Sequence, residues 1–333
     1  MCNEKETVKK ILANADFELK EMGSAFAPTN IALCKYWGKR DKVLNLPLNS
    51  SLSISLGDTG TATKVYISDK PYDEVFLNGD RVSTDSVFMA RVLEFVDLLR
   101  PSPDISLIIK TINSVPTSAG LASSASGFAA LIMALDDIFG YNLSPEELSI
   151  IARLGSGSAA RSIHNGFVLW EKGERTDGMD SFAKRLDIDW PEFCIGIITL
   201  TQEEKEVSSR EGMQNTIETS HLYKSWPKQA EQDLKTMLTA IEARDFKTLG
   251  ETVEHNAFSM HATMMSSFPP LIYMKPGTLS TISWVHQLRK DGIPVYITMD
   301  AGPNVKLIFE EKDAENIQMN FPKMKIIRPF KEN

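Results

Sequence analysis

The sequence of 333 residues has few cysteines, no long apolar stretch and no excess of positive charge. Its three cysteines, Cys2, Cys34 and Cys194, are widely separated and lack CxxC spacing, so we expect free thiols in a reducing compartment. No run approaches the ~18 apolar residues that cross a bilayer. Residues 1–20 lack the apolar segment of a secretory signal. We therefore expect a cytoplasmic chain without a membrane partner.

The balance of 36 basic and 44 acidic residues, a net charge of -8, argues against general nucleic-acid binding. It leaves room for a small basic pocket that takes an anionic ligand. The five histidines show no metal-binding spacing, and we interpret them as structural or surface residues. Hydrophobic and charged fractions of 42% and 24% are typical of a folded globular protein. At ~150 residues per domain, the length predicts about two domains.

Apolar spacing predicts α+β structure in each half of the chain. We place the boundary at 187–192, which gives domains 1–190 and 191–333, with 1–22 as an extension of the first. No long linker separates them, so we expect close packing. The expected strands are 26–34, 52–56, 63–67, 105–112, 193–200, 295–299 and 305–309. The expected helices are 86–99, 123–139, one that begins at 144–147, 216–223, 228–242, 246–264 and 279–290.

A run of small residues from Pro116 to Gly127 joins an expected strand to an expected helix. Small side chains let a backbone approach a ligand closely, and a helix N-terminus offers unpaired N–H groups to an anion. The hydroxyls of Ser123, Ser124 and Ser126 add donors, and they could also reach a magnesium ion. A turn that merely packs a helix on a sheet fits the composition equally well. The run lacks the Gly-Lys-Ser/Thr ending of a Walker A loop.

The pattern Pro-x-x-x-Gly-Leu-x-Ser-Ser-Ala in this run resembles the ATP loop of the GHMP kinase superfamily. Further segments, in collinear order, resemble motifs of the mevalonate diphosphate decarboxylase family within it. They are Asn30 to Asp41, Ser156 to Ser162, Asp300 to Asn304 and, more weakly, Ser266 to Met274. The resemblance implies the GHMP kinase fold, with a ribosomal-protein-S5-like N-terminal domain, a ferredoxin-like C-terminal domain and a cleft between them.

By this resemblance the loop binds ATP, with a magnesium ion beside Ser124. The family converts mevalonate diphosphate and ATP to isopentenyl diphosphate, ADP, phosphate and carbon dioxide, by phosphorylation of the 3-hydroxyl. The resemblance also implies a homodimer. The expected nucleotide contacts are Pro116, Ser118, Ala119, Gly120, Leu121, Ala122, Ser123, Ser124 and Ser126.

Asp300, Lys35 and Arg161 are the candidates for the chemistry. Asp300 precedes Ala-Gly-Pro, where an Asp often bonds its own backbone, but the resemblance implies that it receives the hydroxyl proton or orients that hydroxyl. Lys35 lies in a loop with two aromatic residues; lysines there are usually solvated, and the resemblance puts it beside the reacting hydroxyl. Arg161 suits the substrate carboxylate, although a surface position at a helix end fits the pattern as well.

The resemblance also implies the residues that hold the substrate. Ser209 and Arg210 follow Ser208, a candidate helix N-cap, and are expected to touch the diphosphate. The full expected set is Tyr36, Trp37, Gly38, Lys39, Ser156, Gly157, Ser158, Ala159, Ala160, Arg161, Ser209 and Arg210.

The chain departs from the family at one part of the expected diphosphate clamp. An Arg is expected on the helix after the turn at 77–79, but Phe88 stands there, with Arg91 one turn later. Either Arg91 or Arg210 compensates, or the diphosphate is held more weakly. A decarboxylase that acts on mevalonate monophosphate is an alternative for the same reason. A small-molecule kinase of the superfamily is a further alternative, although such kinases commonly carry an Asp in the second small-residue motif. A silent ligand sensor is disfavoured because all three catalytic candidates are present.

Overall fold

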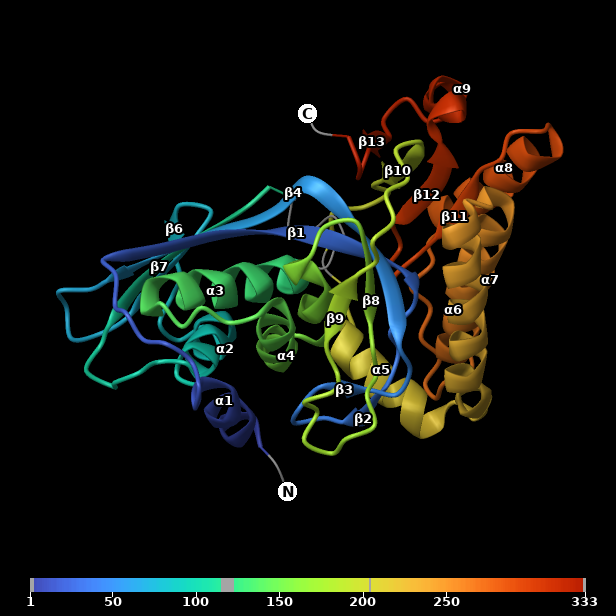
Figure 1. Ribbon diagram of the computed structural model, residues 1–333. Helices are drawn as coiled ribbons and strands as arrows, with labels where there is room; N and C mark the ends of the chain where they lie inside the picture. Colours follow the sequence, from blue (N-terminus) through green and yellow to red (C-terminus); the bar gives the residue numbers. More distant parts are fainter. Residues whose placement is uncertain (1–2, 115–122, 204, 332–333) are drawn as a thin grey trace.

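The computed structural model describes residues 3–114, 123–203 and 205–331. Within these residues a seven-stranded sheet and a four-stranded sheet lie side by side, each with helices packed on it (Figure 1). This arrangement confirms the α+β class expected from the sequence. None of the described helices is both long and apolar enough to cross a membrane.

The first sheet is organised around one long strand. β4 pairs antiparallel with β1, β7 and β8. The two strands expected at 52–56 and 63–67 are its two ends, because β1 pairs with both of them and a register shift between Pro28 and Asn30 absorbs the bend. The strands are β1 (Met22–Cys34), β4 (Ser51–Ile67), β5 (Glu74–Leu77), β6 (Asp80–Arg81), β7 (Leu107–Asn113), β8 (Phe167–Trp170) and β9 (Ala183–Arg185).

Helices cover one face of this sheet. α3 lies along β1 and β4, and its expected span of 123–139 is confirmed (Figure 1). α4 begins at the segment 144–147 expected from the sequence, and its N-terminus has a capping box in which Ser144 and Glu147 each accept a hydrogen bond from the other's backbone N–H. The start of α3 and the end of α4 lie at the same place, where the site forms. The helices are α1 (Glu4–Leu12), α2 (Val87–Val96), α3 (Ser123–Phe139) and α4 (Pro145–Gly155), followed by the 3-10 helix η1 (Gly157–Ile163).

The second sheet has the order β11-β12-β10-β13 and is antiparallel throughout. Its strands are β10 (Phe193–Ile198), β11 (Tyr296–Thr298), β12 (Val305–Glu310) and β13 (Lys325–Ile327). Its helices are α5 (Ser209–Thr219), η2 (His221–Ser225), α6 (Trp226–Ala243), α7 (Phe246–Met265), α8 (Pro276–Lys290), η3 (Glu311–Asp313) and α9 (Ala314–Asn320). The bounds expected for the helix at 216–223 were wrong. The capping box of Ser208 and Glu211 starts α5 earlier, α5 ends at Thr219, and the separate 3-10 helix η2 follows.

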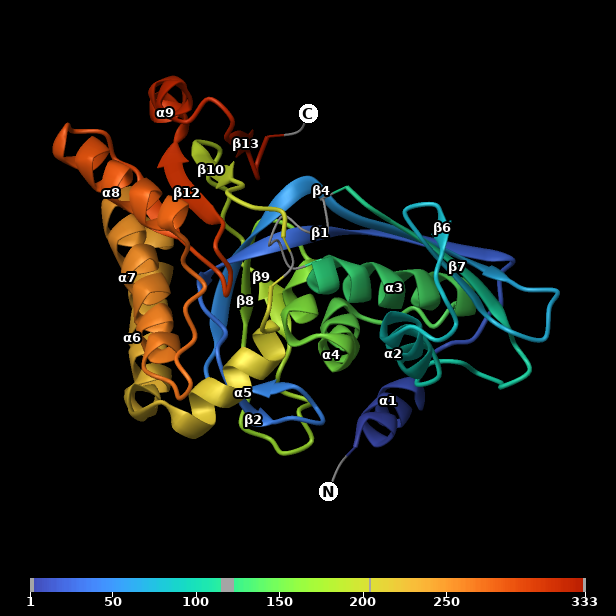
Figure 2. The same ribbon diagram turned by 180° about the vertical axis from the view of Figure 1, so that it is seen from behind.

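The two halves share one apolar core. Ile31 and Leu52 of the first sheet belong to the same buried cluster as Phe193 of the second sheet and Met260 of α7. In the view from behind, α6 and α7 stand beside the ends of β1 and β4 (Figure 2). The end of β1 thus leads into the junction, where the small hairpin of β2 (Lys39–Asp41) and β3 (Leu46–Pro47) follows.

Candidate active site

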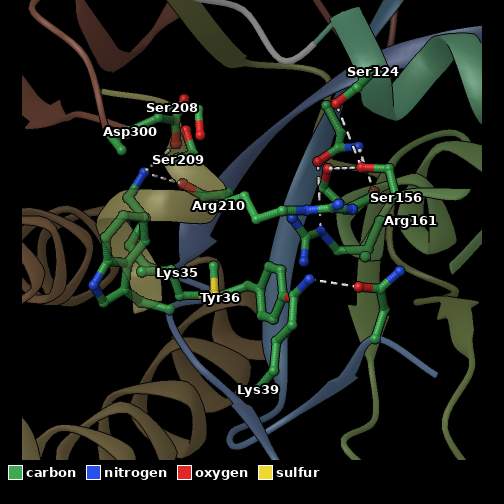
Figure 3. A pocket seen from close by; sticks show the side chains of 18 of the residues that line it. Lys35, Tyr36, Lys39, Ser124, Ser156, Arg161, Ser208, Ser209, Arg210 and Asp300 are labelled. Carbon is green, nitrogen blue, oxygen red and sulfur yellow. Dashed lines mark hydrogen bonds and ion pairs between the residues drawn. The ribbon is translucent and has the colours of Figure 1, made fainter. Parts of the chain in front are cut away.

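A cavity of about 400 Å³ lies at the junction of the two halves and collects most of the predicted substrate residues (Figure 3). The described residues that line it include one carboxylate, that of Asp300, and six cations. The cations are Lys35, Lys39, Arg91, Arg161, Lys205 and Arg210. The whole chain carries a net charge of -8, so this positive charge is local. Such a concentration of one sign attracts anionic ligands.

Asp300 follows β11 and lies between two buried lysines. Its Oδ1 accepts a hydrogen bond from Lys35 Nζ at 2.9 Å, and its Oδ2 accepts one from Lys306 Nζ at 3.0 Å. Desolvation alone would raise the pKa of Asp300, but the charges of Lys306 and Lys35 hold that pKa well below its ordinary value. The carboxylate is therefore ionised at physiological pH and acts as a hydrogen-bond acceptor.

Lys35 is fixed through its backbone as well as its side chain. Its N–H donates to Asn256 Oδ1 of α7 at 2.8 Å, and its carbonyl accepts from Asn49 Nδ2 at 2.9 Å. Both asparagines are buried. The ammonium group also donates to the carbonyl of Ala32 at 2.8 Å. Burial lowers the pKa of Lys35, and the charge of Asp300 opposes this shift. The position of this lysine is thus set by both halves of the protein.

Arg161, in η1, is a buried cation without an ion pair among the described residues. Its guanidinium donates to Ser51 Oγ at 2.6 Å and to Asn30 Oδ1 at 3.4 Å, and it lies 5.6 Å from the ring of Trp170. Burial lowers its pKa to about 10, so it still carries its charge at neutral pH. A buried charge is costly without a partner, and Arg161 faces the cavity. This is the setting for a ligand carboxylate.

A group of serines lines the cavity between α3 and η1. Ser124 Oγ lies 3.4 Å from Ser156 Oγ, which lies 3.4 Å from Ser158 Oγ. Ser126 points elsewhere: it is buried, and its Oγ is 2.7 Å from Thr61 Oγ1 of β4, so it does not line the cavity. Ser123 begins α3. The other predicted nucleotide contacts lie outside the described residues: Pro116, Ser118, Ala119, Gly120, Leu121 and Ala122.

Lys39, Arg91 and Arg210 form the opposite end of the cavity, which we call the cationic end. Burial, followed by the charges of Arg210 and Arg91, lowers the pKa of Lys39 to about 8. Arg91 donates weakly to the carbonyl of Gly155 at 3.4 Å. Phe88 does not line the cavity and is 44% exposed. Arg91, one turn further along α2, lines the cavity instead.

Lys39 is held in place from behind. Its Nζ donates to Asn45 Oδ1, and Asn45 Nδ2 donates to the carbonyls of Arg153 and Leu154 at 2.9 and 2.8 Å. The side chain of Arg153 is itself buried and donates to backbone carbonyls of Leu44 and Gly178.

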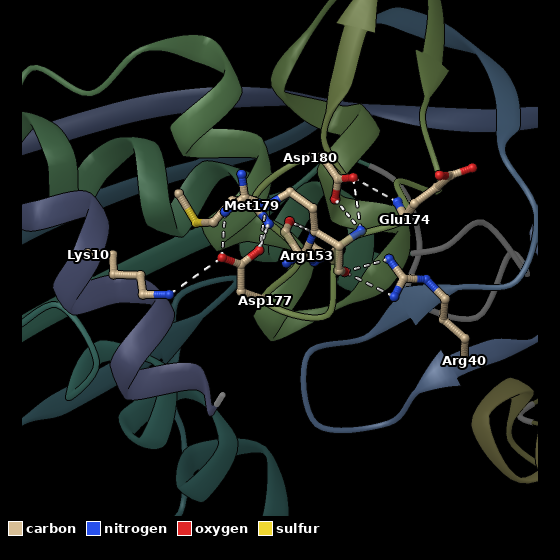
Figure 4. A network of polar contacts seen from close by, with 9 residues as sticks. Lys10, Arg40, Arg153, Glu174, Asp177, Met179 and Asp180 are labelled. Carbon is tan, nitrogen blue, oxygen red and sulfur yellow. Dashed lines mark hydrogen bonds and ion pairs between the residues drawn. The ribbon is translucent and has the colours of Figure 1, made fainter. Parts of the chain in front are cut away.

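Figure 4 shows how the same network continues outward. Arg40 donates to the carbonyl of Arg175, and the side chain of Arg175 pairs with Asp177 at 2.7 Å. Asp177 also lies 3.5 Å from Lys10 of α1. The hairpin that carries Lys39 is thus attached to α4 and α1.

The remaining predicted substrate residues give the cavity its shape. Tyr36, Trp37 and Gly157 line it, whereas Gly38, Ala159 and Ala160 do not. Gly38 has φ 129°, and a Cβ there would lie 1.7 Å from Tyr223 Oη. Ala159 and Ala160 are fully buried. These small residues let η1 and the 35–38 loop pack closely and do not themselves face a ligand.

Comparison with known proteins identifies the relatives of this chain. Residues 27–183 match the diphosphomevalonate decarboxylase-like N-terminal domain, and residues 195–328 match the mevalonate 5-diphosphate decarboxylase C-terminal domain. This chain belongs to the mevalonate diphosphate decarboxylase family. The decarboxylase mvd1 of Aspergillus fumigatus is 41% identical over 310 residues, which cover 87% of this chain and 77% of that protein.

Solved structures of the family agree with the fold. The mevalonate diphosphate decarboxylase of Staphylococcus aureus matches with a TM-score of 0.87 at 39% identity and covers 92% of this chain and 95% of that one. Another, described as MDDEF in complex with MVAPP, AMPPCP and magnesium, matches with a TM-score of 0.86 at 41% identity and covers 93% and 97%. The GHMP kinase fold expected from the sequence is confirmed.

Two cations of the site were missed by the sequence analysis. Lys205 lines the cavity and donates to Ser209 Oγ at 3.1 Å, but its neighbours Glu203 and Glu206 make the segment look like a solvated charge run. Lys306 lies two residues after the DAGPN motif, and that proximity is the signal that could have found it. The N-cap role considered for Ser208 is confirmed, and this residue also lines the cavity.

The described residues contain no group of three or more His, Cys, Asp or Glu side chains that could hold a metal ion. His261 is buried, and its Nε2 lies 3.2 Å from the carbonyl of Asp300. Burial, with the charge of Lys35, lowers the pKa of His261 to about 4. The ring is therefore neutral and donates one hydrogen bond to the backbone of the site.

Proposed function

We propose that this chain decarboxylates mevalonate 5-diphosphate in an ATP-dependent reaction that yields isopentenyl diphosphate in the mevalonate pathway. The observation that carries the proposal is the charge of the cavity, whose described lining includes six cations and one ionised carboxylate. The substrate brings a carboxylate and a diphosphate, and ATP brings further phosphates. Each of these anionic groups has a separate cationic partner in the cavity.

Asp300 orients the tertiary 3-hydroxyl of the substrate. Because Lys35 and Lys306 keep its carboxylate ionised, Asp300 accepts a hydrogen bond from the hydroxyl and directs the oxygen toward the terminal phosphorus of ATP. As the new oxygen–phosphorus bond forms, the bond from that phosphorus to ADP breaks, and the hydroxyl proton moves along the hydrogen bond to the carboxylate of Asp300. Lys35 and Lys205 lie beside this point and stabilise the negative charge that spreads over the transferred phosphoryl group.

Arg161 holds the carboxylate that is lost. Its buried guanidinium has no ion pair among the described residues, and its fork geometry suits two carboxylate oxygens. When phosphate leaves, the tertiary carbon becomes electron-poor, and the electrons of the bond to the carboxyl carbon form the new double bond. Arg161 fixes the direction of that bond.

The cationic end binds the diphosphate. Lys39, Arg91 and Arg210 converge there without a carboxylate partner among the described residues. Three cations suit the larger negative charge of a diphosphate better than that of a monophosphate. The family membership favours the same substrate and argues against a kinase that stops at the phosphorylated alcohol.

ATP and magnesium fit the donors at the start of α3. The hydroxyl of Ser124 is exposed at this N-terminus, where helix N–H groups favour phosphate. Magnesium binds oxygen ligands and keeps phosphates and waters in its shell, so Ser124 and the phosphates of ATP would hold it without a protein carboxylate cluster. When bound, the ion supplies charge neutralisation on the phosphates. The solved relative with AMPPCP and magnesium supports this assignment.

The cell compartment and assembly complete the proposal. We place the chain in the cytoplasm as a homodimer that acts on small molecules and binds neither nucleic acid nor membrane. The net charge of -8 supports the absence of nucleic-acid binding. Light scattering of the purified protein measures the assembly, and a mass of one chain would overturn the homodimer.

Product analysis tests the proposed reaction. The protein is incubated with ATP, magnesium and either mevalonate, its monophosphate or its diphosphate, and carbon dioxide and alkene are measured. We expect both products with the diphosphate. Release from the monophosphate alone would identify a monophosphate decarboxylase, and ADP without carbon dioxide would identify a kinase.

A further inference from the structure

Lys306 is a lysine with an unusual position. It lies on β12 with its side chain 1% exposed, and it does not line the cavity. Its Nζ is 3.0 Å from Oδ2 of Asp300, whose side chain is 32% exposed toward the cavity. The cation therefore reaches the reacting end of the site from behind, through Asp300.

Three elements hold Asp300 from three directions. Lys35, directly after β1, donates to Oδ1, Lys306 of β12 donates to Oδ2, and His261 of α7 donates to the backbone carbonyl at 3.2 Å. With both oxygens bound on opposite sides, the carboxylate cannot rotate without breaking a charge-assisted bond. Of the two cations on the carboxylate, only Lys35 lines the cavity, so Lys306 is free of any direct contact with a ligand there.

Fold stability is a poor explanation for such a lysine. Burying two cations around one carboxylate carries a large desolvation cost, and well-packed apolar residues of similar volume often stabilise a protein as well or better. Apolar neighbours are close at hand on the same face of the sheet, because Ile308, two residues along β12, and Ile197, the partner of Lys306 on β10, belong to the buried core. The cation at this point therefore calls for a role in the reaction.

We propose that Lys306 is a positioning residue for the reaction, which holds Oδ2 of Asp300 so that the carboxylate presents a fixed acceptor to the substrate hydroxyl. The proposal rests on the proposed function of the same site. It adds a residue that touches neither reactant and acts through Asp300.

The charged and titratable groups that face Asp300 come from several elements. They are Lys35 just after β1, Arg161 of η1, Lys205 of the segment after β10, His261 of α7 and Lys306 of β12. Removal of Lys306 takes away one of the two cations bonded to the carboxylate, so the pKa of Asp300 rises. The acid limb of the turnover profile then moves to higher pH.

Lys306→Met tests the proposal because it keeps the length and apolar stem of the side chain and removes its charge. We expect kcat to fall by about 10- to 100-fold, as for the loss of one charge-assisted bond, and both KM values to stay within about threefold. The acid limb of kcat should shift to higher pH. Lys325 is an exposed lysine of the same sheet, so Lys325→Met is the matched control. It should change neither kcat nor the acid limb of its pH profile.

A double-mutant cycle with Asp300→Asn shows whether the two residues act as one unit. Urea unfolding of the single and double variants measures their coupling without any activity. We expect the stability effects to be clearly non-additive. Additive effects, or a Lys306→Met variant with unchanged kcat, would overturn the positioning role. A wild-type protein that releases no carbon dioxide would overturn the proposed function, while the cycle would still report on the contact.

Discussion

The two ends of the cavity carry charge in opposite ways. At one end Asp300 lies between Lys35 and Lys306, and every charged group of this trio has a partner. At the cationic end, Lys39, Arg91 and Arg210 have no carboxylate within 4.0 Å among the described residues. At the end that holds Asp300, which we call the paired end, the charged groups of the protein partner one another without a ligand. This suits a group that must be oriented to within a fraction of an ångström. The cationic end becomes complete only when an anion arrives.

The difference shows in the cost of each arrangement. Burial, together with the nearby charges of Arg210 and Arg91, lowers the pKa of Lys39 to about 8, so the surroundings of Lys39 disfavour its charged form. A diphosphate relieves this repulsion on binding. At Asp300 the neighbouring charges act the other way and favour ionisation. Variants at the paired end should therefore change turnover, and variants at the cationic end should change substrate affinity.

Asp300→Asn should have the largest effect. The amide cannot carry the charge that orients the hydroxyl, so we expect kcat to fall by about 10²- to 10⁴-fold. Binding of an ATP analogue, followed by fluorescence, should change little. The variant also leaves Lys35 and Lys306 buried without a counter-ion, so it should unfold at lower urea concentration and must be assayed well below its midpoint.

Asp187→Asn is the matched control for this substitution, since Asp187 is exposed and lies before β10. It should keep wild-type turnover. If folded Asp300→Asn retains activity within tenfold of wild type, the assigned role of Asp300 is wrong and the paired end is not where the chemistry takes place.

Arg210→Ala addresses the cationic end. Loss of one charge-assisted phosphate contact should raise the KM for mevalonate diphosphate by about 10- to 100-fold, with little change in kcat or in the KM for ATP. Lys224→Ala, at an exposed lysine of η2, should leave all three constants unchanged. A fall in kcat with unchanged KM would contradict the division of labour between the two ends.

The sequence was sufficient for features that depend on neighbouring residues. The sequence at Ser144 predicts the start of a helix, and the apolar run from Phe193 predicts a buried strand. The structure confirms both elements as α4 and β10. The candidate residues in short motifs, such as Lys35 and Arg161, also lie at the cavity. The residues of one motif are close in the chain, so the fold has little freedom to separate them.

Features that depend on where a turn or a helix face directs a side chain were missed. Lys306 pairs with Asp300 because the turn between β11 and β12 brings both to one place, whereas a strand pattern alone suggests a solvated lysine. Ser126 shares a motif with Ser124, yet the helical turn directs it toward Thr61. Which face of a helix meets the cavity depends on packing against the sheet, and the motif does not encode that.

The pH dependence of substrate binding sharpens the comparison further. Because the pKa of Lys39 is lowered to about 8, this side chain loses its charge as pH rises from 7 to 9 in the free protein. The KM for the diphosphate should then rise by about three- to tenfold over this interval, while kcat at saturation stays nearly constant. Lys39→Arg keeps its charge and should remove the rise. A flat wild-type profile at constant ionic strength would show that Lys39 does not bind the diphosphate.

Phe88→Arg should have the smallest effect and asks whether the cationic end has room for one more charge. Positions 88 and 91 are three residues apart on α2 and share a face, so an arginine at 88 lies beside Arg91. Phe88 is 44% exposed, and a solvated charge contact contributes little, so we expect the KM for the diphosphate to fall by only about two- to fivefold. Val87→Arg adds the same charge at the neighbouring, more exposed position and should leave KM unchanged. Equal effects of the two variants would mean that general electrostatic attraction, and not a contact on this face of α2, sets the affinity. That result would argue against a diphosphate contact by Arg91.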